Sequence, residues 1–193
     1  MGSNLFALLE LASEAGGLIT THAALERGIS RRALAGMTQR GLIEHVSRGV
    51  YRLVHSQADP FASYRTVIMW AQAHRGPRVA LSHETALTIL ALSDANPSQI
   101  HLTIPSDVRF RRHLPTRVTI HRAPLDDKDV MEHEGLQLTS FSRTVIDVAR
   151  SGNMRFAGDA IIQGRREGYI TERESKRLTA ELEQILHGTG AAG

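Results

Sequence analysis

Four glycine breaks constrain the start of this 193-residue chain more than any other feature. Glycine ends helices and opens tight turns, so each segment between two such breaks has room for one short element. The breaks stand at Gly16–Gly17, Gly28, Gly41 and Gly49. A chain divided in this way builds its first 55 residues from short local elements and not from one long helix.

The segments predict a definite order of elements. A first helix is followed by a short extended segment at Leu18–Ile19 and by a second helix over Thr21–Arg27. Ser30 is suited to cap a third helix that ends at Gly41, and a hairpin then turns at Arg48–Gly49. Two helices joined by a short turn and followed by a hairpin are the order of a winged helix-turn-helix.

The third predicted helix has one apolar side. At 100° per residue from Ser30, the side chains of Leu34 and Met37 and the position of Gly41 fall within about 40° of one line. We therefore expect this line to face the core of the domain.

The opposite side of that helix carries side chains suited to DNA bases. Arg32 and Gln39 lie nearly opposite the apolar line, and the small residues Ala35 and Gly36 on either side of them permit close approach. In the major groove, arginine pairs with guanine and an amide pairs with adenine. Arginines at the flanks and in the hairpin suit phosphates. The predicted DNA-binding residues are Arg31, Arg32, Gln39, Arg40, Arg48 and Arg52.

Positive charge is concentrated in this part of the chain. From Arg27 to Arg52 there are six arginines and one acid, Glu44, whereas the whole chain has a net charge of only +3. A bias toward arginine is also typical of GC-rich genomes, but its position within the motif indicates contact with nucleic acid. The alternative is a winged helix that binds protein.

A second domain of mixed α/β type is predicted after a linker-like segment at 55–60, which gives domains 1–56 and 57–193. Asp59 and Pro60 are suited to open its first helix. We expect an α+β protein in which the winged helix is followed by a small sheet and C-terminal helices. The expected strands are 98–105, 116–123 and 135–140. The expected helices begin after Pro60 and after the N-caps Ser82 and Ser140, and two more lie at 155–166 and 171–186, the last with a Thr171/Glu174 capping box.

Three histidines raise the question of a metal site. His101 and His121 lie on neighbouring predicted strands and His83 begins a nearby helix, so their imidazoles can converge. No pair has the HExxH or i, i+4 spacing that makes such a signal specific. Histidines at strand and cap positions are the commoner case, and we predict neither a metal site nor a cofactor.

Two fragments match the D/E-x-K element of metal-dependent nucleases, Asp126-x-Lys128 and Glu174-x-Lys176. That element needs a strand with a second acid just upstream, so that two carboxylates hold Mg²⁺ beside the lysine. The first fragment lies in a predicted loop and the second at a helix start. We therefore predict no catalytic residues and no enzyme, and keep a nuclease with a DNA-binding module as the alternative.

The composition favours a chain that stays in the cytoplasm. There is no cysteine, which excludes disulfides and thiolate metal sites, and no apolar run approaches the length of a membrane span. The first residues carry no basic segment of the kind that begins a secretory signal.

Several segments in order resemble the AbiEi family, antitoxins of bacterial abortive-infection toxin-antitoxin systems. The resemblance covers roughly residues 15–150. It rests on the stretch from GLITTHAALERGIS to RGVYRL, followed by ALSHETALTILAL, IHLTIP, VTIHRAPL and EGLQLTSFSRTVIDVAR.

The resemblance implies an autorepressor and antitoxin. Members of the family have an N-terminal winged helix that binds inverted repeats in their own promoter and a C-terminal domain responsible for antitoxicity. The cognate toxin is a nucleotidyltransferase-like protein, neutralised directly or indirectly. The six residues named above are the ones onto which DNA contacts carry over.

Overall fold

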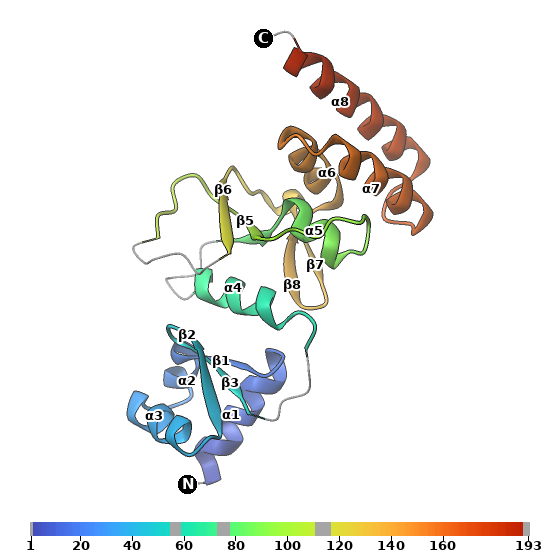
Figure 1. Ribbon diagram of the computed structural model, residues 1–193. Helices are drawn as coiled ribbons and strands as arrows, with labels where there is room; N and C mark the ends of the chain where they lie inside the picture. Colours follow the sequence, from blue (N-terminus) through green and yellow to red (C-terminus); the bar gives the residue numbers. More distant parts are fainter. Residues whose placement is uncertain (1, 55–58, 73–77, 111–116, 191–193) are drawn as a thin grey trace. The chain divides into compact units, whose positions relative to one another are not determined.

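The computed structural model describes residues 2–54, 59–72, 78–110 and 117–190 (Figure 1). The chain divides into two compact units, the first Met1–Pro77 with Phe110–Pro115, the second Arg78–Arg109 with Thr116–Gly193. The predicted boundary between residues 56 and 57 lies outside the described residues. Helix α4 (Ala62–Gln72), which the sequence analysis assigned to the second domain, groups with the first unit. Among the described residues, no helix combines the length and the apolar character needed to cross a membrane.

The first unit is a winged helix-turn-helix, as predicted. Its three strands form an antiparallel sheet in the order β1-β3-β2. The elements before α4 are α1 (Gly2–Glu14), β1 (Leu18–Thr20), α2 (Thr21–Glu26), α3 (Arg31–Gln39), β2 (Ile43–Ser47) and β3 (Val50–Leu53).

Helix α2 turns into α3 through a glycine in the left-handed region. Gly28 has a φ of 76°, and the Ile29 N–H donates to the carbonyl of Ala24 at 2.8 Å. This turn places Ile29 in the core, where it is fully buried. The Ala33 N–H then donates to Ser30 Oγ at 3.1 Å, so Ser30 caps α3 as predicted.

The core of the first unit collects one apolar side of each helix against the small sheet. Because α3 is held by this core and by its cap, its other side stays free for contacts outside the chain. The buried residues of the cluster are Leu8, Leu11, Ala12, Ile19, Ala24, Ile29, Leu34, Met37 and Ile43.

The second unit is built on a five-stranded mixed sheet with the order β6-β5-β4-β8-β7. β5 and β6 are parallel, β4 is antiparallel to β5 and parallel to β8, and β7 is antiparallel to β8. Its elements are β4 (Ala80–Leu81), α5 (His83–Ile89), β5 (Ile100–Ile104), β6 (Val118–Arg122), the 3₁₀ turn η1 (Asp127–Asp129), β7 (Val130–His133), β8 (Leu136–Thr139), α6 (Phe141–Arg150), α7 (Met154–Arg166) and α8 (Glu172–Gly190).

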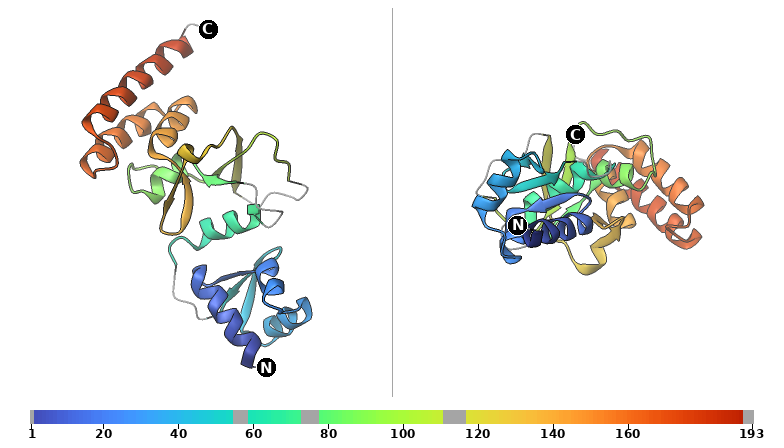
Figure 2. Two further views of the ribbon diagram at one scale, coloured as in Figure 1. Left: turned by 180° about the vertical axis from the view of Figure 1, so that it is seen from behind. Right: turned by 90° about the horizontal axis from the view of Figure 1, so that it is seen from below.

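The three C-terminal helices pack together beside this sheet, as the front and back views both show (Figures 1 and 2). Helix α7 comes close to α6 at Gly164, where a Cβ atom would overlap the buried ring of Phe141. Helix α8 begins with the predicted capping box, in which the Thr171 N–H donates to Glu174 and the Glu174 N–H donates back to Thr171 Oγ1.

The structure corrects several local predictions in the second unit. The segment after Leu125 was predicted as a loop, but it forms η1 and then strand β7, which pairs with β8. Ser82 and Ser140 stand at the N-cap positions of α5 and α6 but their side chains make no capping hydrogen bond. The Ser82 hydroxyl instead accepts a hydrogen bond from Thr103 at 2.8 Å, because the strands bring these two buried groups together.

Candidate nucleic-acid interface

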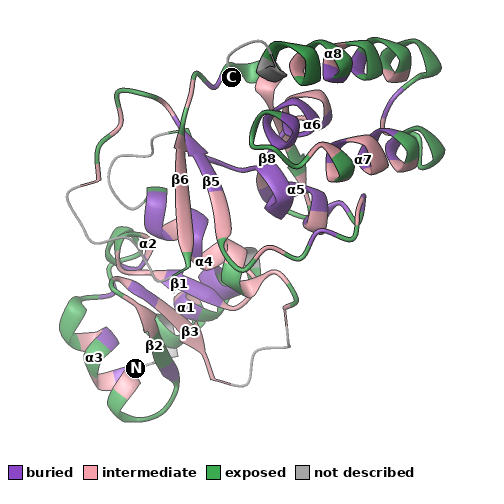
Figure 3. Ribbon diagram, turned by 45° about the horizontal axis from the view of Figure 1, so that its top comes forward, coloured by how far each residue is buried: buried purple, intermediate pink, exposed green. Residues whose placement is uncertain are grey.

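Helix α3 presents the two sides that its sequence predicts. Leu34 and Met37 are buried, whereas Arg32 and Gln39 are exposed. Figure 3 shows that α3 contains buried, intermediate and exposed residues. The prediction that Gly41 faces the core is wrong. The helix ends at Gln39 and Gly41 has a φ of 68°, so the helical periodicity no longer applies there and Gly41 is exposed.

The N-terminal end of α3 is strongly positive. Arg31 and Arg32 are its first two residues, both exposed, and its first turn contains no acid. The helix dipole also places partial positive charge at this end, so two cations there cost stability where an acid would add it, by roughly 0.3–1 kcal/mol per group. Positive potential from side chains and backbone together suits a phosphate.

The guanidinium of Arg40 lies over α3 and not beyond it. Its Nη1 is 3.6 Å from the position that a Cβ of Gly36 would occupy. The backbone N–H of Arg40 closes the helix by donating to the Gly36 carbonyl at 3.2 Å, and the side chain lies back along the helix. Arg40 thus adds a third cation to the same helix.

The hairpin between β2 and β3 carries the other two predicted residues. Arg48 is exposed in the two-residue turn, and the carbonyl of Gly49 accepts the Thr21 N–H at 2.8 Å. This bond fastens the turn to the start of α2, so Arg48 stands on an anchored loop.

Arg52 differs from the other five. It lies opposite Glu44 in the register of β2 and β3, and its Nε is 2.9 Å from Glu44 Oε1. Within the described part of the chain, Arg31, Arg32, Arg40 and Arg48 have no such acidic partner. Four side chains are therefore available to phosphates at once, whereas Arg52 has to leave a carboxylate.

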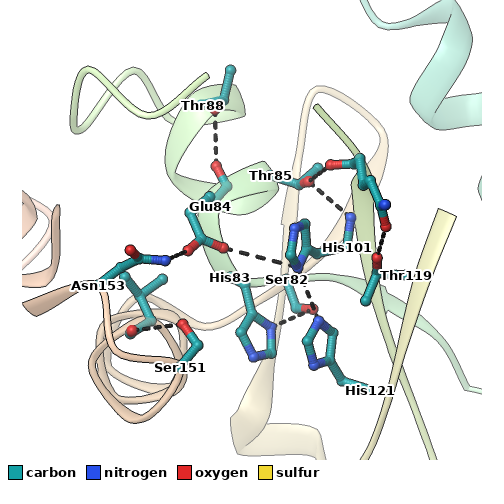
Figure 4. A network of polar contacts seen from close by, with 12 residues as sticks. Ser82, His83, Glu84, Thr85, Thr88, His101, Thr119, His121, Ser151 and Asn153 are labelled. Carbon is teal, nitrogen blue, oxygen red and sulfur yellow. Dashed lines mark hydrogen bonds and ion pairs between the residues drawn. The ribbon is translucent and has the colours of Figure 1, made fainter. Parts of the chain in front are cut away.

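The structure also brings together the three histidines of the second unit (Figure 4). His83 comes from the start of α5, His101 from β5 and His121 from β6. His101 Nδ1 and His121 Nε2 are 2.9 Å apart, and the rings of His83 and His121 stack with centroids 3.6 Å apart.

A glutamate that the sequence analysis did not single out lies beside these histidines. Glu84 is buried, and its Oε2 is 3.8 Å from His101 Nδ1. Its other oxygen accepts a hydrogen bond from Asn153 at the start of α7. The only signal in the sequence is its position directly after His83, in the segment that precedes a predicted helix.

The three histidines are neutral near pH 7. Burial, together with the smaller effects of the charges of His121, His101 and Arg143, lowers the pKa of His83 from its ordinary value to about 3. Burial also lowers the pKa values of His101 and His121, although the carboxylate of Glu84 opposes this effect.

The two nuclease-like fragments lack the arrangement that their chemistry requires. Asp126 and Lys128 are exposed at the turn η1, and Glu174 and Lys176 are exposed in the first turn of α8. Neither pair stands on a strand. The Glu174 carboxylate is engaged in its capping box, and the Asp126 N–H donates to Asp129.

The second unit also contains a cavity of about 670 Å³ lined by side chains of both charges. Arg143 lies in it, paired with Asp147 at 2.8 Å as the i, i+4 spacing predicts and with Asp129 at 3.5 Å. Arg150 and Arg177 line the same cavity. Within the described residues, Arg143 is thus paired inside this cavity with Asp147 and Asp129, and Arg177 lies 3.8 Å from Glu181.

Comparison with solved structures supports the overall fold. The crystal structure of the RV2827C protein from Mycobacterium tuberculosis is similar over 93% of this chain and 72% of its own, with a TM-score of 0.57 and 15% identity. At this identity the likeness concerns the fold alone. No curated protein matches the chain.

Comparison with family models addresses the first unit. A model described as "Transcriptional regulator, AbiEi antitoxin" matches residues 7–54. This range begins inside α1, ends directly after β3, and so contains α2, α3 and the hairpin. Over its winged helix-turn-helix, the chain thus matches the AbiEi antitoxin family of transcriptional regulators, the family that its sequence resembles.

Proposed function

We propose that the protein is an antitoxin that represses its own operon. Its winged helix binds inverted repeats in promoter DNA, and the second unit neutralises a nucleotidyltransferase-like toxin, directly or indirectly. The site of action is the cytoplasm, where both partners are found. The family match over residues 7–54 supports this role, but one observation carries the DNA-binding part of the proposal. This is the exposed side of α3, with unpaired Arg31 and Arg32 at its positive end.

The proposed contacts fall into two kinds. Arg32 and Gln39 lie on the outer side of α3 and read bases in the major groove. Arg31, Arg40 and Arg48 contact phosphates, and Arg52 joins them when it leaves Glu44. Phosphate contacts fix the position of the helix, and base contacts give the sequence preference.

Binding assays on two DNA duplexes separate these kinds. Arg32→Ala and Gln39→Ala are expected to weaken binding to the protein's own promoter by about 1–3 kcal/mol and to weaken binding to random DNA far less. Arg48→Ala is expected to weaken both and to reduce the slope of log K against log salt by about one. Arg173→Ala, an exposed arginine at the start of α8, is the matched control and leaves both affinities unchanged. An equal loss on both duplexes for all three variants contradicts base reading by α3.

Salt dependence tests the proposal as a whole. Contacts to roughly 4–6 phosphates per protomer give a slope of about −4 to −5 for log K against log salt. Affinity that does not change with salt contradicts the proposed interface. Absence of any shift with promoter DNA, together with tight co-purification of the toxin, supports a winged helix that binds protein instead.

The antitoxin part is tested in cells that express the adjacent toxin gene. If the first unit binds DNA and the second unit neutralises the toxin, Arg32→Ala should affect DNA binding only. This variant should then relieve repression of the operon and still protect cells from growth inhibition by the toxin. Loss of growth rescue with normal folding contradicts the division of tasks. A neighbouring reading frame that does not encode a nucleotidyltransferase-like protein removes the assigned toxin.

A further inference from the structure

Three imidazoles from three different elements converge in the second unit. The ligand nitrogens of His83, His101 and His121 all lie within 4.8 Å of one another. Nitrogens bound to one tetrahedral zinc ion at about 2.0–2.1 Å lie roughly 3.4 Å apart. Rotations of the imidazole rings are therefore needed to bring the three nitrogens to one ion.

The backbone brings these residues together from three separate elements. β5 and β6 are parallel neighbours with Thr103 opposite His121, and His83 begins the helix that follows β4 on the other side of β5. His83 has a φ of 53°, in the left-handed region that a non-glycine residue rarely occupies. Such conformations cost of order 1–3 kcal/mol and cluster at functional sites.

Among the described residues, a buried carboxylate oxygen beside the cluster has no hydrogen-bond partner. Glu84 Oε2 is 3.8 Å from His101 Nδ1, and the side chain of Glu84 is only 8% exposed. An unsatisfied buried acceptor costs about 1–3 kcal/mol, and more when it is charged. In metal sites, a carboxylate in this place accepts the second N–H of a ligating imidazole and so orients the ring.

The hydrogen bond between His101 and His121 competes with a hydrogen bond from His101 to Glu84. His101 Nδ1 faces His121 Nε2 at 2.9 Å, so its proton cannot serve His121 and Glu84 at the same time. An ion on His121 Nε2 removes this competition. His101 then binds the ion through its other nitrogen and donates Nδ1–H to Glu84.

We propose that His83, His101 and His121 bind a divalent transition-metal ion, with Zn²⁺ as the favoured occupant and Glu84 as the positioning carboxylate. Three neutral nitrogens without a thiolate suit zinc and leave a fourth position for water or a partner group. Because the rings of His83 and His121 stack at 19°, their in-plane lone pairs do not meet, and binding turns one of these rings about its soft terminal torsion.

The charges around the cluster allow a cation. Glu84 supplies a full negative charge, and Arg143, whose charge acts on His83, is paired with both Asp147 and Asp129.

The ion has a structural consequence for the sheet. In the part of the chain that the structure describes, β6 is an edge strand that pairs with β5 alone. An ion held by His121 and His83 ties this edge to α5 across β5. Zinc is therefore expected to raise the unfolding temperature of the second unit.

The test is a competition titration of the chelator-stripped full chain with Zn²⁺ against a chromophoric chelator. One equivalent is expected to bind. His121→Asn, on a half-exposed edge strand, is expected to weaken that binding at least 100-fold, and Glu84→Gln to weaken it about 10- to 100-fold. His22→Ala, an exposed histidine of α2, is the matched control and retains the site.

Two results overturn the proposal. One is the absence of stoichiometric binding, and the other is equal binding by the wild type and His121→Asn, which assigns the zinc to scattered surface histidines. Far-UV circular dichroism confirms that each variant is folded. Cobalt added to the wild type gives a readout that needs no variant, because a tetrahedral site produces intense visible absorption and a solvated ion does not.

Discussion

Glu44 and Arg52 face each other across β2 and β3, with Arg52 Nε 2.9 Å from Glu44 Oε1. Both side chains are about half exposed, so the pair itself contributes little to stability. The pair with Glu44 nevertheless keeps the guanidinium of Arg52 away from a DNA phosphate. Glu44→Gln removes the competing charge and is expected to raise affinity for DNA at low salt by up to about fivefold, which corresponds to about 1 kcal/mol.

Fluorescence anisotropy with a labelled duplex at two salt concentrations measures this effect. The gain should shrink at the higher salt concentration because exposed charges are screened. Glu183→Gln on α8, which is also exposed, is the control for the change in net charge. An affinity equal to that of the control, or lower, means that Arg52 does not approach the DNA.

Individual residues differ in how far the sequence predicts them. The exposure of Arg32 and Gln39 follows from helical periodicity, which depends only on residues close together in the sequence and can be recognised there. The pairing of Arg52 depends on the register of two strands, which also contains a bulge between His45 and Ser47. The partner of His101, Glu84, depends on how a helix meets a sheet, and no periodic pattern encodes that.

Helix α7 contains two glycines that offer a matched experiment at the scale of an element. Gly164 lies where α6 and α7 approach, and a Cβ there would overlap the ring of Phe141. That ring is buried and stacked on Tyr169, so it has little room to move. Gly164→Ala is expected to lower the free energy of unfolding by about 1–3 kcal/mol.

Gly158 lies in the same helix, and a Cβ there would meet nothing within 4 Å. Gly158→Ala is expected to raise the free energy of unfolding by about 0.5–1 kcal/mol, because alanine favours the helix. Urea denaturation of Gly164→Ala and Gly158→Ala measures whether each substitution raises or lowers the free energy of unfolding. Stabilisation by both substitutions shows that α6 and α7 separate more easily than their packing indicates.

At the level of elements, sequence prediction succeeds where the signals are local. Ser30 and the Thr171/Glu174 box mark helix starts that form as expected, because the capping oxygen and the N–H that donates to it are three residues apart. Strand β7 was missed since it is a short edge strand whose partner, β8, supplies its hydrogen bonds. Ser82 has the sequence of a cap, but its hydroxyl is taken by Thr103 from another strand.

The whole chain consists of two units with separate cores, so ligands of the two should stabilise them separately. The single tryptophan makes this measurable. Trp70 is buried in α4 of the first unit, and its ring lies 4.7 Å from that of Phe110 in the same unit. Its fluorescence therefore follows the unfolding of the first unit, whereas far-UV circular dichroism follows the helices of both.

Promoter DNA at about 100 times its Kd stabilises the state that binds it by about 2.7 kcal/mol. For a unit of this size, that is expected to raise the midpoint of the tryptophan transition by about 10–20 °C. Random DNA at the same concentration is the control and should give a smaller rise. The part of the dichroism signal that comes from the second unit should keep its midpoint, because the proposed contacts all lie on α3 and the hairpin. An equal shift in both signals means that the two units unfold together, and a shift confined to the second unit contradicts DNA binding by the winged helix.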